Sequence, residues 1–121
     1  RGLVQAGNNV MIGGFIVSGA SGSINLVVRV LGPTLSSFGV ANALADPTLQ
    51  LYDGNGTVIA FNNNWKDSQQ TQIQNSGRQP PNNLEPAIAV TAPPGHYTAI
   101  VRGNNNTTGV GLVEVYQVAH F

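Results

Sequence analysis

Apolar and polar residues alternate in short stretches along most of the chain, and Gly, Pro, Asn and Asp separate one stretch from the next. β-Branched and aromatic residues, which pack well on a pleated sheet, dominate these stretches and predict strands over residues 24–31, 48–52, 57–61, 87–92, 97–102 and 110–117. Another strand is expected within residues 8–19 (NNVMIGGFIVSG). About seven to nine short strands with at most one short helix are typical of an antiparallel β-sandwich, of either jelly-roll or immunoglobulin-like topology.

The last third of the chain gives the clearest local arrangement. Residues 103–109 (GNNNTTG) tolerate positive φ, so we expect the strands over 97–102 and 110–117 to pair as a hairpin symmetric about Asn106. In that register one face is apolar and belongs to the core. The opposite face carries an apolar stripe that is unusual on a solvated surface and that we expect to be covered: Ile100, Leu112 and Tyr116.

The strand within residues 8–19 does not alternate, as if both of its faces were buried. A β-bulge at Gly13 and Gly14 would explain this, because a bulge switches which side chains point inward. The alternative interpretation is that this strand lies between its own sheet and a neighbouring molecule.

Turn signals indicate three connections. The DGNG sequence of residues 53–56 predicts a second hairpin, since Asp, Asn and Gly accept the positive φ of tight turns. Residues 19–23 (GASGS) predict a flexible turn. Gly32-Pro33 ends a strand, and residues 34–45 are expected to cross between sheets, with one helical turn at most.

One helix and one ion pair are expected. The helix covers residues 69–76, is capped by Asp67 or Ser68, is anchored by Ile73 and ends at Gly77. Arg29 lies opposite the apolar face of the strand over residues 24–31, and its charge predicts a structural pair with a carboxylate. The two candidates for that carboxylate are Glu114 and Asp46.

The composition narrows the class of protein. A chain of 121 residues is long enough for one domain, residues 1–121, with its own core. Only 8% of the residues are charged, against about 25% in ordinary soluble domains, and the net charge is zero. Identical copies therefore repel each other little, and no basic field attracts nucleic acid. No apolar run reaches the length of a membrane span, no signal peptide is present and no cysteine occurs. A chain that begins at Arg1 is interpreted as a processed product or one unit of a longer chain.

Four segments resemble a β-sandwich module that recurs, often in tandem, in large secreted or surface proteins of environmental bacteria: NVMIGGFIV, ADPTLQLYD, YTAIVRG and TTGVGLVEVY. The resemblance covers nearly the whole chain, and the second half is more distantly similar to pre-peptidase C-terminal modules. This resemblance implies an extracellular or cell-surface building block without catalytic activity. It supplies no active-site residues.

The residues themselves carry no catalytic pattern. Neither His96 nor His120 accompanies a nucleophile motif or a neighbouring acid, and the acidic residues are scattered. We therefore expect no enzymatic activity, no cofactor and no metal. The DGNG turn superficially resembles a calcium loop, but the twelfth position counted from Asp53 is Asn64, where a bidentate Glu is required. A plain turn is favoured over a calcium site formed by Asp53, Asn55 and residues 62–64.

Carbohydrate binding is the alternative function, because Trp65 follows Asn63 and Asn64 in a polar loop, and a flat aromatic ring beside amides suits a sugar. The competing interpretation is that Trp65 is buried against the core. Possible glycosylation sequons occur at Asn55, Asn105 and Asn106, all in expected turns.

The leading hypothesis is a structural subunit or repeat of an extracellular assembly. We expect it to polymerise head-to-tail as a filament by β-strand addition, in which residues 9–17 or 116–121 complete the sheet of the next copy. Its partners would be copies of itself, and surface glycans in the alternative. An accessory domain of a secreted hydrolase is a third interpretation. The candidate contact residues are Val10, Met11, Ile12, Phe15, Ile16, Val17, Ile100, Leu112, Tyr116, Val118 and Phe121.

Overall fold

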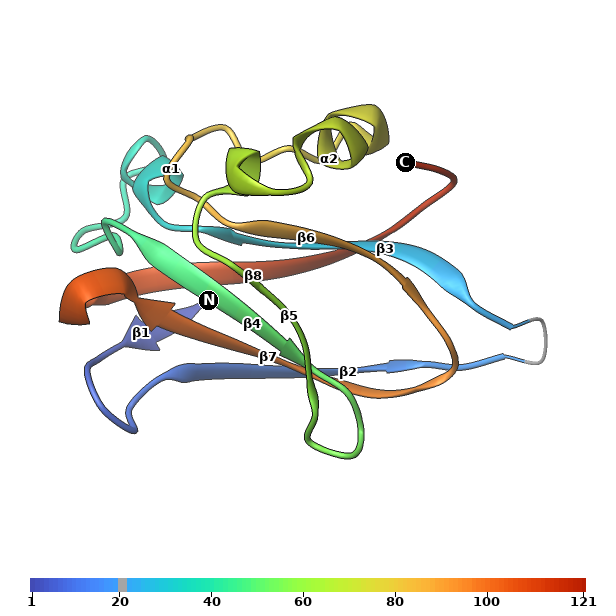
Figure 1. Ribbon diagram of the computed structural model, residues 1–121. Helices are drawn as coiled ribbons and strands as arrows, with labels where there is room; N and C mark the ends of the chain where they lie inside the picture. The colour runs from blue at the N-terminus through green and yellow to red at the C-terminus, as the bar shows by residue number, and fades with distance from the viewer. Residues whose placement is uncertain (20–21) are drawn as a thin grey trace.

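The computed structural model describes residues 1–19 and 22–121, and these contain eight strands and two α-helices (Figure 1). The strands are β1 (Gly2–Val4), β2 (Met11–Val17), β3 (Ile24–Leu31), β4 (Pro47–Tyr52), β5 (Val58–Asn62), β6 (Ala87–Ala92), β7 (Gly95–Gly103) and β8 (Gly109–Val118). The helices are α1 (Pro33–Ser36) and α2 (Gln70–Ser76), and the 3-10 turns are η1 (Trp65–Asp67) and η2 (Asn104–Asn106). The turn expected over residues 19–23 lies partly outside the described residues.

Two four-stranded antiparallel sheets pack face to face and confirm the predicted β-sandwich. Sheet I has the strand order β1-β8-β3-β6, and sheet II has the order β2-β7-β4-β5. Successive strands pair as nested partners: β1 with β8, β2 with β7, β3 with β6 and β4 with β5. This is the jelly-roll arrangement, in which one long hairpin is rolled into two sheets.

The DGNG turn lies at the centre of this roll. Met11 pairs with Val101 and Ile24 pairs with Ala92, so the midpoints of these two pairs are residues 56 and 58. Asp53 holds the turn, because its Oδ1 accepts hydrogen bonds from the Asn55 and Thr57 backbone N–H groups at 2.9 and 3.0 Å. The hairpin predicted at residues 53–56 is confirmed.

The hairpin predicted about Asn106 is wrong. β7 pairs with β2 and β4 in sheet II, whereas β8 pairs with β1 and β3 in sheet I. The connection bends between the sheets because Asn105 and Asn106 adopt positive φ and Gly109 approaches Leu44 too closely for a side chain. The Asn104 side chain also donates to Asp46 Oδ2 at 2.9 Å, which ties the connection to the start of β4. Alternation alone specifies the face of a strand and not its partner.

The bulge predicted at Gly13 and Gly14 is also absent. The pairing of β2 with β7 runs without interruption from Met11 to Val17, and burial alternates along the strand. Met11, Gly13, Phe15 and Val17 face sheet I. Ile12 and Ile16 face outward and are 63% and 65% exposed, so the apolar run marks an uncovered face and not two buried ones.

Two apolar clusters stabilise the sandwich. The larger one fills the space between the sheets and includes Leu26, Val28 and Val30 of β3, as their alternation predicts. The smaller one lies on the outer face of sheet I, where α2 and η1 cover β3 and β6 with Ile73 and Trp65. All of these side chains are buried.

The predicted helix over residues 69–76 is confirmed as α2, which begins at Gln70 and ends at Gly77 with φ of 75°. The expected caps are wrong, because Gln69 is the N-cap residue and makes no side-chain capping bond. A second, single-turn helix, α1, lies at the start of the crossover over residues 34–45, where one helical turn was expected.

Two acidic residues hold the outer parts of sheet I. Arg29 donates to Glu114 Oε1 at 2.9 Å, which confirms the first of the two predicted partners. Glu85 is fully buried, and its carboxylate accepts hydrogen bonds from the N–H groups of Gly32, Thr34 and Asn82 and from the Thr34 hydroxyl, at 2.6–3.0 Å. Glu85 therefore links the α1 crossover to the segment before β6.

Candidate functional site

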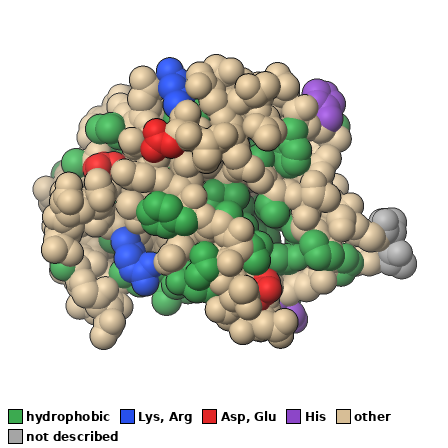
Figure 2. All heavy atoms as spheres, in the orientation of Figure 1, with side chains coloured by type: hydrophobic (Ala, Val, Ile, Leu, Met, Phe, Trp, Pro, Cys, Tyr) green, Lys and Arg blue, Asp and Glu red, His purple; other side chains and the backbone are tan. Residues whose placement is uncertain are grey.

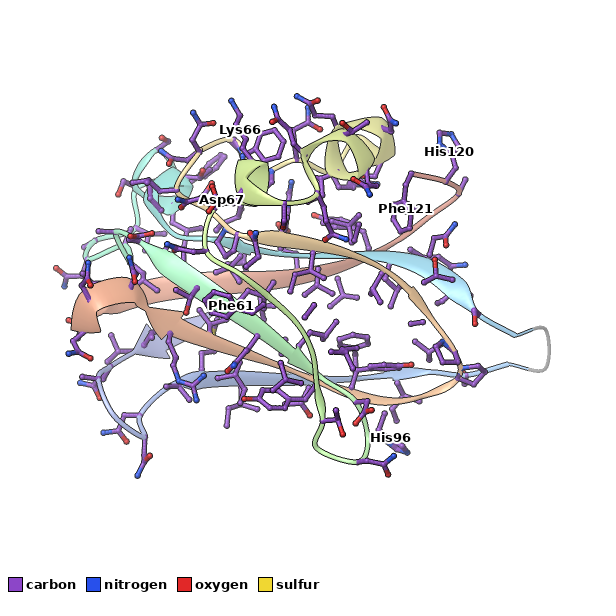
Figure 3. All side chains as sticks on the ribbon, in the orientation of Figure 1. Phe61, Lys66, Asp67, His96, His120 and Phe121 are labelled. Carbon is purple, nitrogen blue, oxygen red and sulfur yellow. The ribbon has the colours of Figure 1, made fainter. Side chains whose placement is uncertain are left out.

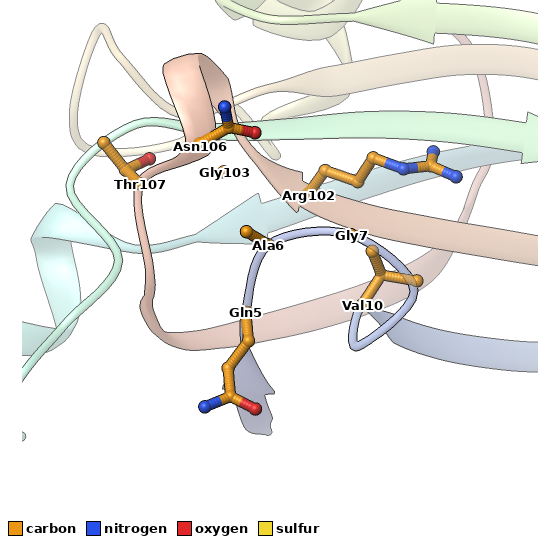
Figure 4. Close-up of a pocket in the computed structure, with 8 residues that line it drawn as sticks. All are labelled: Gln5, Ala6, Gly7, Val10, Arg102, Gly103, Asn106 and Thr107. Atoms are coloured by element: carbon orange, nitrogen blue, oxygen red, sulfur yellow. The ribbon is translucent and has the colours of Figure 1, made fainter.

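The hollows found on the described surface differ in volume and in lining. The hollow in Figure 4 encloses about 40 Å³, enough for a few water molecules and far less than the several hundred Å³ of a typical ligand pocket. Its lining comes from the β1–β2 loop and the β7–β8 connection: Gln5, Ala6, Gly7, Val10, Arg102, Gly103, Asn106 and Thr107. Arg102 is the one charged side chain of this lining and is exposed.

Two larger hollows, of about 260 and 450 Å³, lie between the DGNG turn and the turn before β7. They share Asp53, Pro93 and Tyr97. The Asp53 carboxylate holds its own turn, and the Tyr97 hydroxyl donates to the Pro93 carbonyl oxygen at 2.6 Å. The Asp53 and Tyr97 side chains are thus engaged in turn structure, whereas Asn55 and His96 in the lining of the larger hollow are exposed.

In the described residues, the histidine and acidic side chains do not converge on one centre. His96 and His120 lie far apart, near the bottom and the top of the view in Figure 3. Within residues 1–19 and 22–121, no group of three or more His, Cys, Asp or Glu side chains is placed to hold a metal ion. The residues of the possible calcium site are not brought together. Asp53 lies before the start of β5, whereas Asn62 is the last residue of β5, and its side chain bonds to the backbone of Asn64 and Ala87.

Trp65 offers no surface to a sugar. Its side chain is only 4% exposed and packs with Val27, Ile73, Ala87 and Ala89. Lys66 lies over the indole ring, with Nζ 5.4 Å from the ring centroid. The interpretation of Trp65 as a residue buried against the core is confirmed, and the aromatic platform of the carbohydrate hypothesis is absent. Asn63 and Asn64 are partly buried beside it.

The predicted contact residues separate into two groups. In sheet II, Ile12 and Ile100 are paired neighbours on the outer face, and Ile16 lies on the same face. Phe61 of β5 adds a 58% exposed ring to this face (Figure 3), and Figure 2 shows apolar side chains across it. Val17 is buried, and Met11 and Phe15 pack against the inner core.

Of the remaining predicted contact residues, Leu112, Tyr116 and Val118 belong to β8 in sheet I, so the expected stripe of Ile100, Leu112 and Tyr116 does not exist. Val10 lies in the β1–β2 loop, and Phe121 follows the end of β8. Two guanidinium groups lie over the Tyr116 ring, with the Cζ atoms of Arg29 and Arg78 at 5.1 and 4.3 Å from its centroid. Val118 and Phe121 pack on the cluster around Trp65, so the C-terminal tail is docked on its own chain. The sequons expected in turns are exposed there: Asn55, Asn105 and Asn106.

The sheet edges differ in how they are protected, and this difference defines the candidate site. β1 has three residues, and the pairing of β4 with β5 has an irregular register at Tyr52. Short strands and bulges are recognised means of blunting an edge. At the β6 edge, side-chain amides replace a neighbouring strand. Gln69 donates to the Ala89 carbonyl oxygen and accepts from the Ala89 N–H, both at 2.9 Å, and Asn62 accepts from the Ala87 N–H at 3.0 Å.

β2 has none of these protections. It has seven residues in continuous register with β7, and it contains no charge and no proline. In the described part of the chain, its backbone makes no hydrogen bond outside the ladder with β7. A long, regular, uncharged edge of this kind is a template for another strand.

The same side of the sandwich is open in sheet I. β1 pairs with β8 only from Gly109 to Gly111, so residues 112–118 of β8 have β3 as their one neighbouring strand in the described chain. Val115 pairs with the buried Val28 on the inner face, yet it is 40% exposed. We call β2 and residues 112–118 of β8 the open edge.

Sequence reasoning named β2 but missed the features that single it out. The protection of β6 depends on Gln69, which is twenty positions from Ala89 and carries no local signal of that role. β1 was missed because a strand of three residues is too short to show the alternation of apolar and polar positions. No helix in the described chain has the length and apolar character needed to cross a membrane. Comparisons with protein-family models, with curated proteins and with solved structures found no match.

Proposed function

We propose that this chain is a non-catalytic structural module of an extracellular or cell-surface assembly, and that it associates with copies of itself through the open edge. One observation carries the proposal: three sheet edges are shortened, irregular or capped, whereas β2 presents seven uncharged residues with an unpaired outer side. Natural sheets protect their edges against pairing, so an unprotected one is suited to it.

The charge balance supports self-association. The chain has five Lys and Arg residues and five Asp and Glu residues, so identical copies carry no net repulsion. β2 itself is neutral, and its outward side chains Ile12 and Ile16 are about two-thirds exposed. A strand that pairs with β2 would also cover part of these side chains and gain hydrophobic free energy. The extracellular location rests on the resemblance of segments such as NVMIGGFIV and ADPTLQLYD.

Strand addition in this form requires no strand exchange. β2 already pairs with β7 over its whole length, and Phe121 already packs on the cluster around Trp65. If residues 9–17 or 116–121 were donated to the sheet of another copy, those contacts would first have to break. Pairing of another strand along the free edge of β2, on the side away from β7, adds contacts and breaks none.

Sedimentation velocity over a range of concentrations tests the proposal. We expect the wild-type chain to associate, and Ile16→Lys to weaken association by about tenfold or more, because an edge lysine opposes strand pairing. Leu84→Lys is the matched control, since Leu84 is 45% exposed and lies outside the strands. A wild-type chain that stays monomeric at every concentration would contradict the proposal.

A further inference from the structure

Neither the backbone conformation nor a close contact within the described chain requires glycine at position 14. Its φ is outside the positive range, and a Cβ built on it meets only the Tyr97 carbonyl oxygen, at an ordinary 3.9 Å. Its neighbour Gly13 differs, because a Cβ there lies 3.3 Å from the Val113 side chain. Glycine in a strand interior weakens the strand, and it often marks a bulge, a bend or a place where another backbone approaches closely. No part of the described chain makes such an approach at Gly14.

The side chains on either side of Gly14 complement each other. On the outer face, Ile12 and Ile16 lie two positions before and after it, with nearly equal exposure. On the inner face, Gly13 and Phe15 lie one position before and after it. The Phe15 ring is partly exposed and stacks on Tyr97, with 5.4 Å between the ring centroids.

An antiparallel second copy of β2 centred on Gly14 fits this pattern. Ile12 would face Ile16 of the second copy, which gives two aliphatic cross-strand pairs. Phe15 would face Gly13 of the second copy, and an aromatic ring that covers a cross-strand glycine is a known stabilising pair in sheets. A shift by one residue would move every side chain to the wrong face, and a shift by two residues would place Gly14 opposite Ile12 or Ile16 and lose both matches. The sequence of β2 therefore favours this register.

We propose that β2 pairs antiparallel with β2 of a second copy, with Gly14 at the two-fold axis, so that the two copies of sheet II join into one eight-stranded sheet. This inference rests on the proposed self-association and names its partner and register. The contact is isologous, so it closes as a pair and does not by itself propagate. A filament then requires a second, different contact on each such pair.

Single-cysteine cross-linking tests the register, because the chain has no cysteine of its own. Directly opposed residues of antiparallel strands have Cα atoms about 4.5–5.5 Å apart, within the range that a disulfide spans. Gly14→Cys is expected to form a covalent dimer under mild oxidation at least about tenfold faster than Phe38→Cys, because pairing raises the effective concentration of the thiols. Phe38 is 76% exposed and lies outside the strands, so Phe38→Cys reports random collision.

Two further variants check the register independently of position 14. Ile12→Cys and Ile16→Cys should each form little disulfide-linked dimer alone and should cross-link to each other when the two variants are mixed. Cross-linking of Ile12→Cys with itself would overturn the antiparallel register. A Gly14→Cys rate no greater than that of Phe38→Cys, in a chain that associates in sedimentation, would overturn this pairing and leave the proposed function standing. A chain that does not associate at all would overturn both.

Discussion

Gln69 binds the backbone of Ala89 in both directions: its side-chain amide donates to the Ala89 carbonyl oxygen and accepts from the Ala89 N–H, each at 2.9 Å. One side chain thus makes the two hydrogen bonds that a neighbouring strand would make. The β6 edge is closed within the chain by this pair, whereas β2 has no such partner in the described residues.

Replacing Gln69 should destabilise the fold. Gln69→Ala removes two hydrogen bonds and leaves the Ala89 backbone groups dependent on water, which we expect to lower the free energy of unfolding by roughly 1–3 kcal/mol. Gln72→Ala is the control, because Gln72 is an exposed residue of α2, the helix that Gln69 precedes. Surface substitutions usually change stability by less than about 0.5 kcal/mol. Urea denaturation of both variants measures the difference. Equal stabilities would show that the Gln69 bonds contribute nothing.

The buried carboxylate of Glu85 gives a second prediction. Glu85→Gln places an amide NH₂ group against N–H or O–H donors whichever way it is turned, since both carboxylate oxygens accept two hydrogen bonds. We expect a loss of roughly 2–3 kcal/mol in the free energy of unfolding. Asp67→Asn, at an exposed carboxylate, should leave that free energy within about 0.5 kcal/mol. Comparable losses in the two variants would contradict this account of Glu85.

The burial of Trp65 predicts its fluorescence. The chain has one tryptophan, and its side chain is 4% exposed, so emission from the folded protein should lie at shorter wavelength than from the unfolded protein. Acrylamide should quench it weakly, and added oligosaccharides should leave the spectrum unchanged. A spectrum that shifts with sugar would restore the carbohydrate hypothesis and would require Trp65 to leave its cluster.

Local patterns in the sequence were sufficient for the parts of the fold that depend on near neighbours. Ile73 and Gly77 defined α2, the DGNG sequence defined the central turn, and the apolar alternation along β3 gave the core face. A structural ion pair of Arg29 also followed, because a part-buried charge requires an opposite charge, and the structure selects Glu114 over Asp46 as the partner.

The same reasoning failed where the partner of a strand is distant. β7 and β8 alternate correctly, but their neighbours are β2, β4, β1 and β3, and alternation is the same for any partner. The exposure of Ile12 and Ile16 was unpredictable for a related reason. It depends on which sheet face α2 and the C-terminal tail cover, and they cover sheet I.

Hydrogen exchange at low and high protein concentration tests the central claim most directly, because it compares two strand edges in one sample. We predict that the β2 amides that do not bond to β7 exchange quickly when dilute and become protected as concentration rises. The Ala87 and Ala89 amides, which bond to Asn62 and Gln69, should be protected at both concentrations. Exchange of the β2 amides that does not change with concentration would contradict the claim that a second copy pairs with this edge.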